Sequence, residues 1–166
     1  MKRIKSVFWV LLIMVSCISA CRKDNSRLIA SSSSLISFKV DGVVKKASGA
    51  TKAFAFAITE SNKVRLQILG EVSATEDISF IIENFNGVGE YNLVPQSNTE
   101  ETTSALYQTG EDPLKDYYIS ESGSIKITTS TTKLLKGTFQ FVGKVSPNEA
   151  KLITEGTFEV ALIQTQ

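Results

Sequence analysis

The sequence predicts a single all-β domain at residues 35–166, folded as an antiparallel β-sandwich. Apolar residues recur at every second position in many short segments, and turn-forming residues separate these segments at regular intervals. No segment carries the apolar period of an amphipathic helix over a comparable length. A flattened, lipocalin-like β-barrel is the alternative architecture, because it is built from the same kind of strands.

The first 20 residues have the layout of a secretory signal. Lys2, Arg3 and Lys5 form a basic head, and Val7–Val15 is an uninterrupted apolar run. The segment Ile18-Ser19-Ala20-Cys21 resembles the lipobox of bacterial lipoproteins, in which the chain is cut before the cysteine and the thiol is acylated. The resemblance implies a signal peptide at residues 1–20 and a lipidated Cys21, which anchors the protein to a membrane through its acyl chains.

Two other interpretations of this segment are weaker. A transmembrane helix over residues 7–20 would span roughly 21 Å, which is short of the ~30 Å hydrocarbon core. A plain signal peptide with an incidental cysteine is the second. Residues 21–34, which include a run of four serines, are polar and lack periodicity, so we expect them to form a flexible tether behind the anchor.

The N-terminal half of the domain contains the clearest strand patterns. Residues 36–40 alternate apolar and polar, and Asp41-Gly42 follows before Val43-Val44, which predicts a type I′ hairpin. In Lys52–Thr59 the larger apolar residues fall on one side and three alanines on the other, where another element could pack closely. Further strands are predicted at residues 64–68, after a Ser61-Asn62 turn, and at residues 78–82.

The middle of the domain is less regular. Asn84–Gly89 is predicted to be a loop, and a short strand at residues 90–93 is stopped by Pro95. Gln96–Ser104 is polar and is predicted to be the longest loop. Ala105–Thr109 is expected to form an edge strand, and Asp112-Pro113 breaks the chain again. We expect Asp116–Ser120 and Ser124–Thr129 to form two paired strands around a Ser122-Gly123 turn.

The last third of the chain predicts a long terminal hairpin. Gly137-Thr138-Phe139 is echoed by Gly156-Thr157-Phe158, each within a β-rich segment, and a turn containing Pro147-Asn148 lies between them. The glycines are expected at bulges or where another backbone comes close. Five residues of this hairpin are predicted to lie in the core: Phe139, Phe141, Phe158, Val160 and Leu162.

Composition excludes several classes of function. Removing residues 1–20 takes away three of the 18 basic residues, so 15 face 17 acidic ones and the net charge becomes −2. This balance disfavours nucleic acid as a partner. The chain has no histidine, which removes the commonest general base and zinc ligand, and no cysteine beyond Cys21. We therefore predict no catalytic residue, no metal site and no cofactor.

Acidic residues gather in Glu100–Glu121, where a calcium site is conceivable because calcium prefers oxygen ligands. The regular calcium-binding loop pattern is absent, so a solvated acidic loop is the favoured interpretation. A pair of carboxylates could also serve glycoside hydrolysis. The mature chain has no tryptophan for sugar stacking, and its tyrosines are Tyr91, Tyr107, Tyr117 and Tyr118.

Several features together resemble small uncharacterised lipoproteins of the Bacteroidota. They are the lipobox, Phe38 with Asp41-Gly42, the Gly-x-Tyr-x-Leu strand at residues 89–93, and the Gly-Thr-Phe hairpin. The resemblance implies an all-β domain of unknown function at the outer membrane, on either its periplasmic or its outer surface. It implies no catalytic residues.

The sequence therefore favours a lipid-anchored, non-catalytic binding or accessory domain of the cell envelope. Its expected contact surfaces for a protein or glycan partner are the loops Gln96–Ser104 and Thr109–Lys115, because loops on a rigid sheet usually carry recognition. Two alternatives stay open. One is a carboxylate-dependent hydrolase of glycans, and the other is a structural subunit of a surface assembly that pairs through an open sheet edge.

Overall fold

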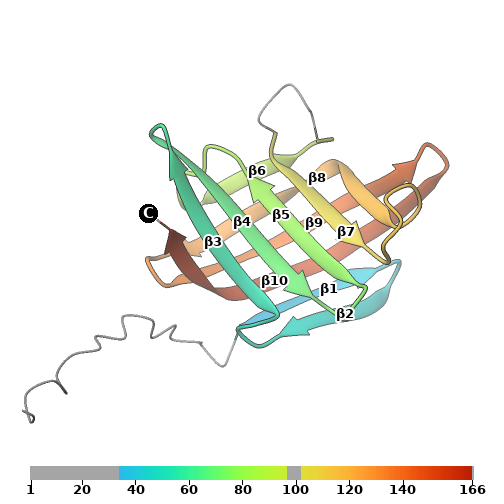
Figure 1. Ribbon diagram of the computed structural model, residues 1–166, viewed down its shortest axis with the longest axis horizontal. Helices are drawn as coiled ribbons and strands as arrows, with labels where there is room; N and C mark the ends of the chain where they lie inside the picture. Colours follow the sequence, from blue (N-terminus) through green and yellow to red (C-terminus); the bar gives the residue numbers. More distant parts are fainter. Residues whose placement is uncertain (1–33, 97–101, 166) are drawn as a thin grey trace, which may run out of the picture.

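The computed structural model describes residues 34–96 and 102–165, which form ten strands of one sheet (Figure 1). This confirms the all-β, antiparallel prediction. The signal-peptide segment, Cys21 and most of the predicted tether lie outside the described residues. The strands are β1 (Leu35–Val40), β2 (Val43–Ser48), β3 (Ala53–Glu60), β4 (Lys63–Glu71), β5 (Asp77–Ile82), β6 (Gly89–Leu93), β7 (Ser104–Gln108), β8 (Tyr117–Ser130), β9 (Leu134–Ser146) and β10 (Glu149–Thr165).

Two layers face each other across the core. Figure 1 shows β3, β4, β5 and β7 crossing in front of β8, β9 and β10 at a wide angle. Strand β10 joins the layers, because it pairs with β9 and β1 along its first part and with β3 through Ala161–Thr165. The β10–β3 pairing is parallel, whereas the other pairings among the described strands are antiparallel. The sheet path ends in β2 at one edge and β6 at the other.

Both predicted tight hairpins are present in the N-terminal half. Asp41 and Gly42 have φ values of 49° and 87° between β1 and β2, and Ser61 and Asn62 have φ values of 50° and 66° between β3 and β4. Two consecutive positive φ angles are the requirement of a type I′ turn, whose twist matches that of the flanking strands. The long terminal hairpin of β9 and β10 is also confirmed.

The prediction that Ala105–Thr109 forms an edge strand is wrong. Residues 104–108 do form a strand, β7, but it pairs with β5 on one side and with β8 on the other. Sequence alternation alone could not distinguish these positions, because the side chains of an edge strand and an interior strand can alternate in the same way.

The predicted pair of strands around Ser122-Gly123 is also wrong, because residues 117–130 form one continuous strand, β8. A register shift between Ser120 and Ser122 marks a bulge in this strand, and Gly123 has a φ of 145°. A Cβ on Gly123 would lie under 3.0 Å from the backbone of Gln140 and Phe141 on β9. The Ser-Gly pair therefore permits a bend and a close strand approach rather than a turn.

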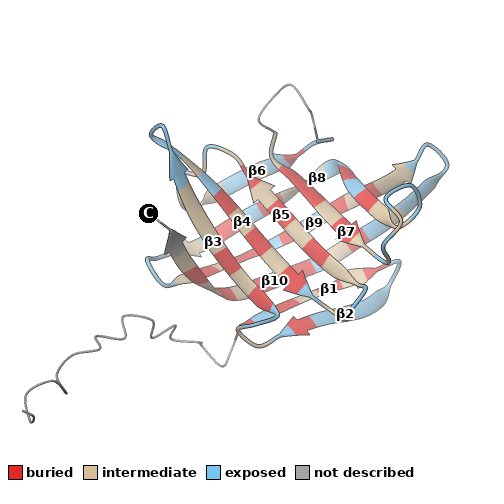
Figure 2. Ribbon diagram, viewed as in Figure 1, coloured by how far each residue is buried: buried red, intermediate tan, exposed pale blue. Residues whose placement is uncertain are grey.

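The core lies between the two layers, and buried positions alternate along the strands (Figure 2). Aromatic rings occupy much of this space. The ring centroid of Phe80 lies 4.7 Å from that of Phe139 and 6.0 Å from that of Phe141. All five residues predicted to lie in the core of the terminal hairpin are buried: Phe139, Phe141, Phe158, Val160 and Leu162.

The alanines of β3 face inward, and its phenylalanines face outward. Ala53 and Ala55 are fully buried, whereas Phe54 and Phe56 are half-buried on the opposite side of the strand. Small inward side chains allow other elements to pack closely on this part of β3. Among residues 34–96 and 102–165, no helix is long and apolar enough to cross a membrane.

Candidate functional site

The predicted contact loop Thr109–Lys115 is held by its own polar groups. The backbone N–H of Asp112 donates to the Asp116 carboxylate at 3.0 Å, and Lys115 pairs with Asp112 at 3.2 Å. Leu114 at the loop tip is 86% exposed. Of the other predicted contact loop, Gln96–Ser104, residues 97–101 lie outside the described chain, and Ser104 is the buried first residue of β7.

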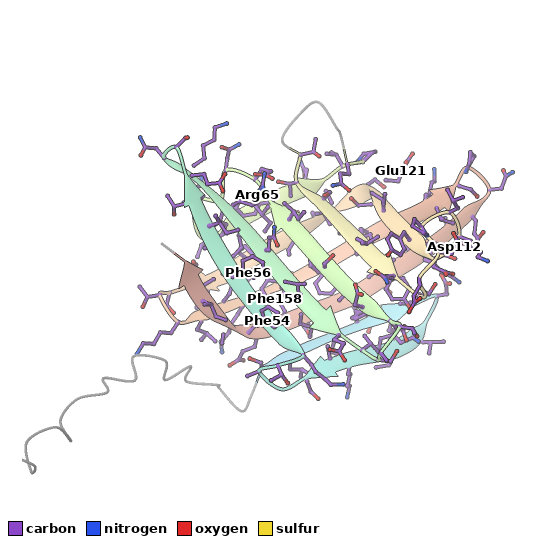
Figure 3. All side chains as sticks on the ribbon, in the orientation of Figure 1. Phe54, Phe56, Arg65, Asp112, Glu121 and Phe158 are labelled. Atoms are coloured by element: carbon purple, nitrogen blue, oxygen red, sulfur yellow. The ribbon has the colours of Figure 1, made fainter. Side chains whose placement is uncertain are left out.

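The acidic cluster predicted over Glu100–Glu121 does not converge in the part that is described. Glu100 and Glu101 lie outside the described residues, and Glu121 pairs with Lys144 on β9 at 3.2 Å. Figure 3 shows Asp112 and Glu121 apart from each other. Among residues 34–96 and 102–165, no group of three or more aspartate, glutamate, histidine or cysteine side chains is arranged to hold a metal ion.

Two buried tyrosines with carboxylate partners occupy one end of the core. The Tyr107 hydroxyl donates to Glu76, and the Lys45 ammonium lies 2.8 Å from the same carboxylate. The ring centroids of Tyr107 and Tyr118 are 6.2 Å apart. Burial and the hydrogen bond to Glu76 raise the pKa of Tyr107.

Tyr118 is held in a similar way on the adjacent strand β8. Its hydroxyl donates to Glu149 at 2.7 Å, and this hydrogen bond, together with burial, raises the pKa of Tyr118 to about 12. Lys151 lies over the Tyr118 ring and pairs with Asp41 at 3.1 Å. The Asp41 carboxylate also accepts the backbone N–H of Leu152, which lowers the pKa of Asp41.

The two tyrosines and their carboxylate partners fill this end of the core, and their phenol groups are poorly suited to catalysis. A tyrosine with a raised pKa is a poorer base and nucleophile at neutral pH than a free phenol, because its deprotonated form is disfavoured. Glu76 and Glu149 both accept a hydrogen bond from a phenol. The remaining tyrosines also have structural positions: Tyr91 bonds Asn86 and Gly87 and fixes the 84–88 loop, and Tyr117 points away from Tyr118.

The outer surface of the rear layer carries a shallow polar groove of about 540 Å³. Strand register builds a row of side chains across four strands: Glu90 on β6 faces Lys126 on β8, Lys126 faces Thr138 on β9, and Thr138 faces Thr157 on β10. Adjacent members of the row are one strand spacing apart, about 4.8 Å. The groove is lined by Glu90, Ser124, Lys126, Thr138, Phe139, Gln140, Glu155, Gly156 and Thr157.

The end of the groove is shaped by a bulge in β10. The register with β9 shifts between Ile153 and Gly156, and Glu155 has a positive φ of 49°. The bulge places Glu155 beside the groove, where its carboxylate pairs with Lys39 on β1 at 2.7 Å. Bulges redirect side chains in this way at many binding sites.

Most polar side chains of the groove have no partner within the described chain. Lys126 and Glu90 form no ion pair there, although their residues are register partners. The groove hydroxyls and amide likewise form no side-chain hydrogen bond within residues 34–96 and 102–165; these belong to Ser124, Thr138, Gln140 and Thr157. The row therefore presents donors and acceptors outward, and they are available to a ligand.

Sequence reasoning missed this groove because its residues look like ordinary strand serines and threonines. The signal for it is the Gly-Thr-Phe echo, which on its own predicts only a hairpin. In the structure Thr138 and Thr157 of the two echoes are direct cross-strand partners. The phenylalanine of each echo points into the core. The threonine that precedes it therefore points outward, because successive side chains of a strand face opposite sides.

Comparison with protein families gives a match over most of the described fold. Residues 43–160 match a domain of unknown function, DUF6252. The chain belongs to the DUF6252 family. The matched range includes every residue that lines the groove, and it leaves out β1 and the part of β10 that pairs with β3. Neither the search of curated proteins nor that of solved structures found a match.

Proposed function

We propose that this DUF6252 domain is a non-catalytic binding domain of the bacterial cell envelope, anchored by lipid on Cys21. Its ligand is a hydroxyl-rich chain, such as a glycan, bound in the groove across β6, β8, β9 and β10. The observation that carries the proposal is the row Glu90–Lys126–Thr138–Thr157, whose polar side chains have no partner in the described chain. A flat, open row of hydroxyl, amide and charged groups matches the hydrogen-bonding needs of a polysaccharide.

Binding without catalysis is favoured by the state of the carboxylates. A glycosidase needs a carboxylic acid whose surroundings keep it protonated, usually through burial. In the groove, the Glu155 side chain is 68% exposed and paired with Lys39. The more buried carboxylates lie elsewhere: Glu76 is held by Tyr107, Glu83 pairs with Arg65, and Asp77, whose pKa is raised by burial, lies outside the groove.

A hydrolase is the second candidate, because two carboxylates, Glu90 and Glu155, line the same groove. Incubation with soluble polysaccharides separates the two functions. We expect retention of the polysaccharide without release of reducing ends. Release that disappears in both Glu90→Gln and Glu155→Gln would contradict the non-catalytic proposal.

The groove is tested by affinity electrophoresis in gels containing xylan, amylopectin or mucin glycans. We expect Lys126→Met to weaken retention at least about tenfold, because a hydrogen bond to a charged group contributes about 1.5–3 kcal/mol. Lys46→Met on β2 is the matched control, since Lys46 also lacks an ion pair within the described residues and lies outside the groove. Equal retention of both variants would argue against binding of the polysaccharide in the groove.

Anchoring is tested in cells by replacing Cys21 with serine. We expect the wild-type protein to incorporate labelled palmitate and to sediment with the outer membrane, and the Cys21→Ser variant to do neither. Protease treatment of intact and of lysed cells then distinguishes display on the outer surface from a periplasmic position. An unmodified mature N-terminus in mass spectrometry would contradict the proposed lipidation.

A further inference from the structure

The front layer has an outer face that differs from the groove face. Its outward positions carry aromatic and aliphatic side chains, and two of them, Phe54 and Phe56, have ring centroids 6.3 Å apart and nearly parallel planes (Figure 3). Phe54 faces Leu69 on β4, and Phe56 lies beside Ile163 on β10. The half-buried apolar side chains of this face are Phe54, Phe56, Ile58, Leu69, Ile81, Leu106 and Ile163.

Register makes this face continuous. From β10 to β7 the cross-strand row is Ala161, Phe54, Leu69, Ser79 and Leu106, so only a small serine interrupts it. A neighbouring row contains Ile163, Phe56, Gln67 and Ile81. An apolar surface that spans five strands of a soluble domain is typical of an interaction site.

Most charged groups at this face form ion pairs. Arg65 on β4 pairs with Glu83 at 2.7 Å, and Lys52 pairs with Glu71 at 3.4 Å. Asp77 on β5 also lies on this face, half-buried beside Glu71 and without an ion pair among the described residues. Beyond this one carboxylate the face carries little uncompensated charge, so it can approach a lipid headgroup layer without strong repulsion.

The described chain begins beside this face. The carbonyl of Ser34 accepts the backbone N–H of Gly49 at 2.8 Å, and its hydroxyl accepts the N–H of Ala161 at 3.2 Å. Ala161 is the register partner of Phe54. Twelve residues lie between Cys21 and Ser34, and the thirteen Cα–Cα steps that join the two reach at most about 45 Å when extended. A lipid on Cys21 would thus hold the bilayer within reach of the apolar face.

We propose that the outer face of β3, β4, β5 and β7 rests on the lipid surface to which the chain is anchored. This inference relies on the proposed acylation of Cys21. The lipid anchor keeps the bilayer at a high local concentration, so a modest apolar area is enough to hold the face on the membrane. Because β8, β9 and β10 lie in the opposite layer, the polar groove then faces away from the bilayer (Figure 1).

The test uses the chain from Cys21 to Gln166, which contains every described residue. Its single thiol, Cys21, is coupled to a maleimide phospholipid in vesicles of phosphatidylethanolamine with a minority of phosphatidylglycerol, so the anchor is imposed chemically. This chain has no tryptophan, since Trp9 precedes Cys21. Single tryptophans are introduced by Phe54→Trp and, as a second reporter on another strand, Leu106→Trp. The matched control on the groove face is Thr138→Trp.

We expect brominated acyl chains to quench Phe54→Trp and Leu106→Trp about twofold, because an apolar face on a bilayer sits ~5–10 Å into the boundary region. Thr138→Trp should keep its fluorescence. Equal quenching of all three reporters, or none at Phe54→Trp and Leu106→Trp, would overturn the proposal. So would a blue shift of both reporters that rises with protein concentration without lipid, since a second copy would then cover the face. Failure of lipidation in cells would appear in palmitate labelling and not in this assay.

Discussion

Gly137 provides the sharpest test of the strand packing beneath the groove. It lies on β9 between Ile127 on β8 and Phe158 on β10, and it is buried. A Cβ at this position would lie under 3.0 Å from the Lys126 carbonyl oxygen and from the Phe158 ring. The carbonyl belongs to the backbone, so it cannot rotate away. Gly137→Ala must therefore shift β8 relative to β9.

Overpacking of this kind costs about 1–3 kcal/mol, and replacing glycine by alanine returns about 0.4–1 kcal/mol through the unfolded state. The difference between these terms is about 0–2.6 kcal/mol, and the upper part applies because the added Cβ meets a fixed backbone atom. We therefore expect Gly137→Ala to lower the free energy of unfolding by about 2 kcal/mol, which corresponds to about 4–8 °C in Tm for a domain of this size. Urea and thermal unfolding followed by circular dichroism measure both quantities.

The matched control is Gly89→Ala on β6, where the nearest atom to the added Cβ is 3.8 Å away. That distance is an ordinary van der Waals contact. We therefore expect the free energy of unfolding of Gly89→Ala to equal that of wild type within about 0.5 kcal/mol, or to exceed it slightly. If the two variants proved equally stable, the close approach of β8 and β9 at Gly137 would be refuted.

Two further predictions concern titrating groups. Tyr118 has its pKa raised to about 12, so the stability that it contributes is complete below its unfolded pKa of 10.0 and is lost as the pH rises through the folded value. In Tyr118→Phe, urea unfolding should show a loss of about 1 kcal/mol at neutral pH and a shallower decline in alkali than in wild type; an unchanged alkaline slope would contradict this. Asp77 has its pKa raised, mainly by burial and then by Glu71, so its ionised form costs stability above 3.8. Asp77→Asn should be more stable than wild type at neutral pH, with a gain that shrinks as the pH falls from the raised folded-state pKa toward 3.8 and is absent below 3.8, and a loss at neutral pH would count against the assignment.

The parts of the fold that could be predicted are those fixed by local chemistry. Asp41-Gly42 and Ser61-Asn62 adopt positive φ angles that these residues tolerate better than most, so two hairpins were predictable from turn residues alone. The inward positions of Phe139 and Phe158 followed from strand alternation. In each case the information lies within a few neighbouring residues.

The errors concern features that depend on distant partners. β7 looks like an edge strand in sequence, and only its pairing with β5 and β8 makes it an interior one. Ser122-Gly123 has the composition of a turn, but β9 runs alongside and keeps β8 extended through it. The groove has the same origin, because Glu90, Lys126 and Thr157 become neighbours only through the register of four strands.

The arrangement of the interior limits where a ligand or partner can act on this domain. Aromatic rings such as Phe80 and Phe139 fill the space between the layers, and the phenols of Tyr107 and Tyr118 are already bonded to carboxylates. The contacts proposed above therefore use outer surfaces. The two layers expose opposite chemistry, polar around Thr138 and apolar around Phe54, so the proposed lipid contact and the proposed ligand contact lie on separate faces. Lys126→Met should therefore leave the quenching of Phe54→Trp unchanged, because the two faces share no side chain.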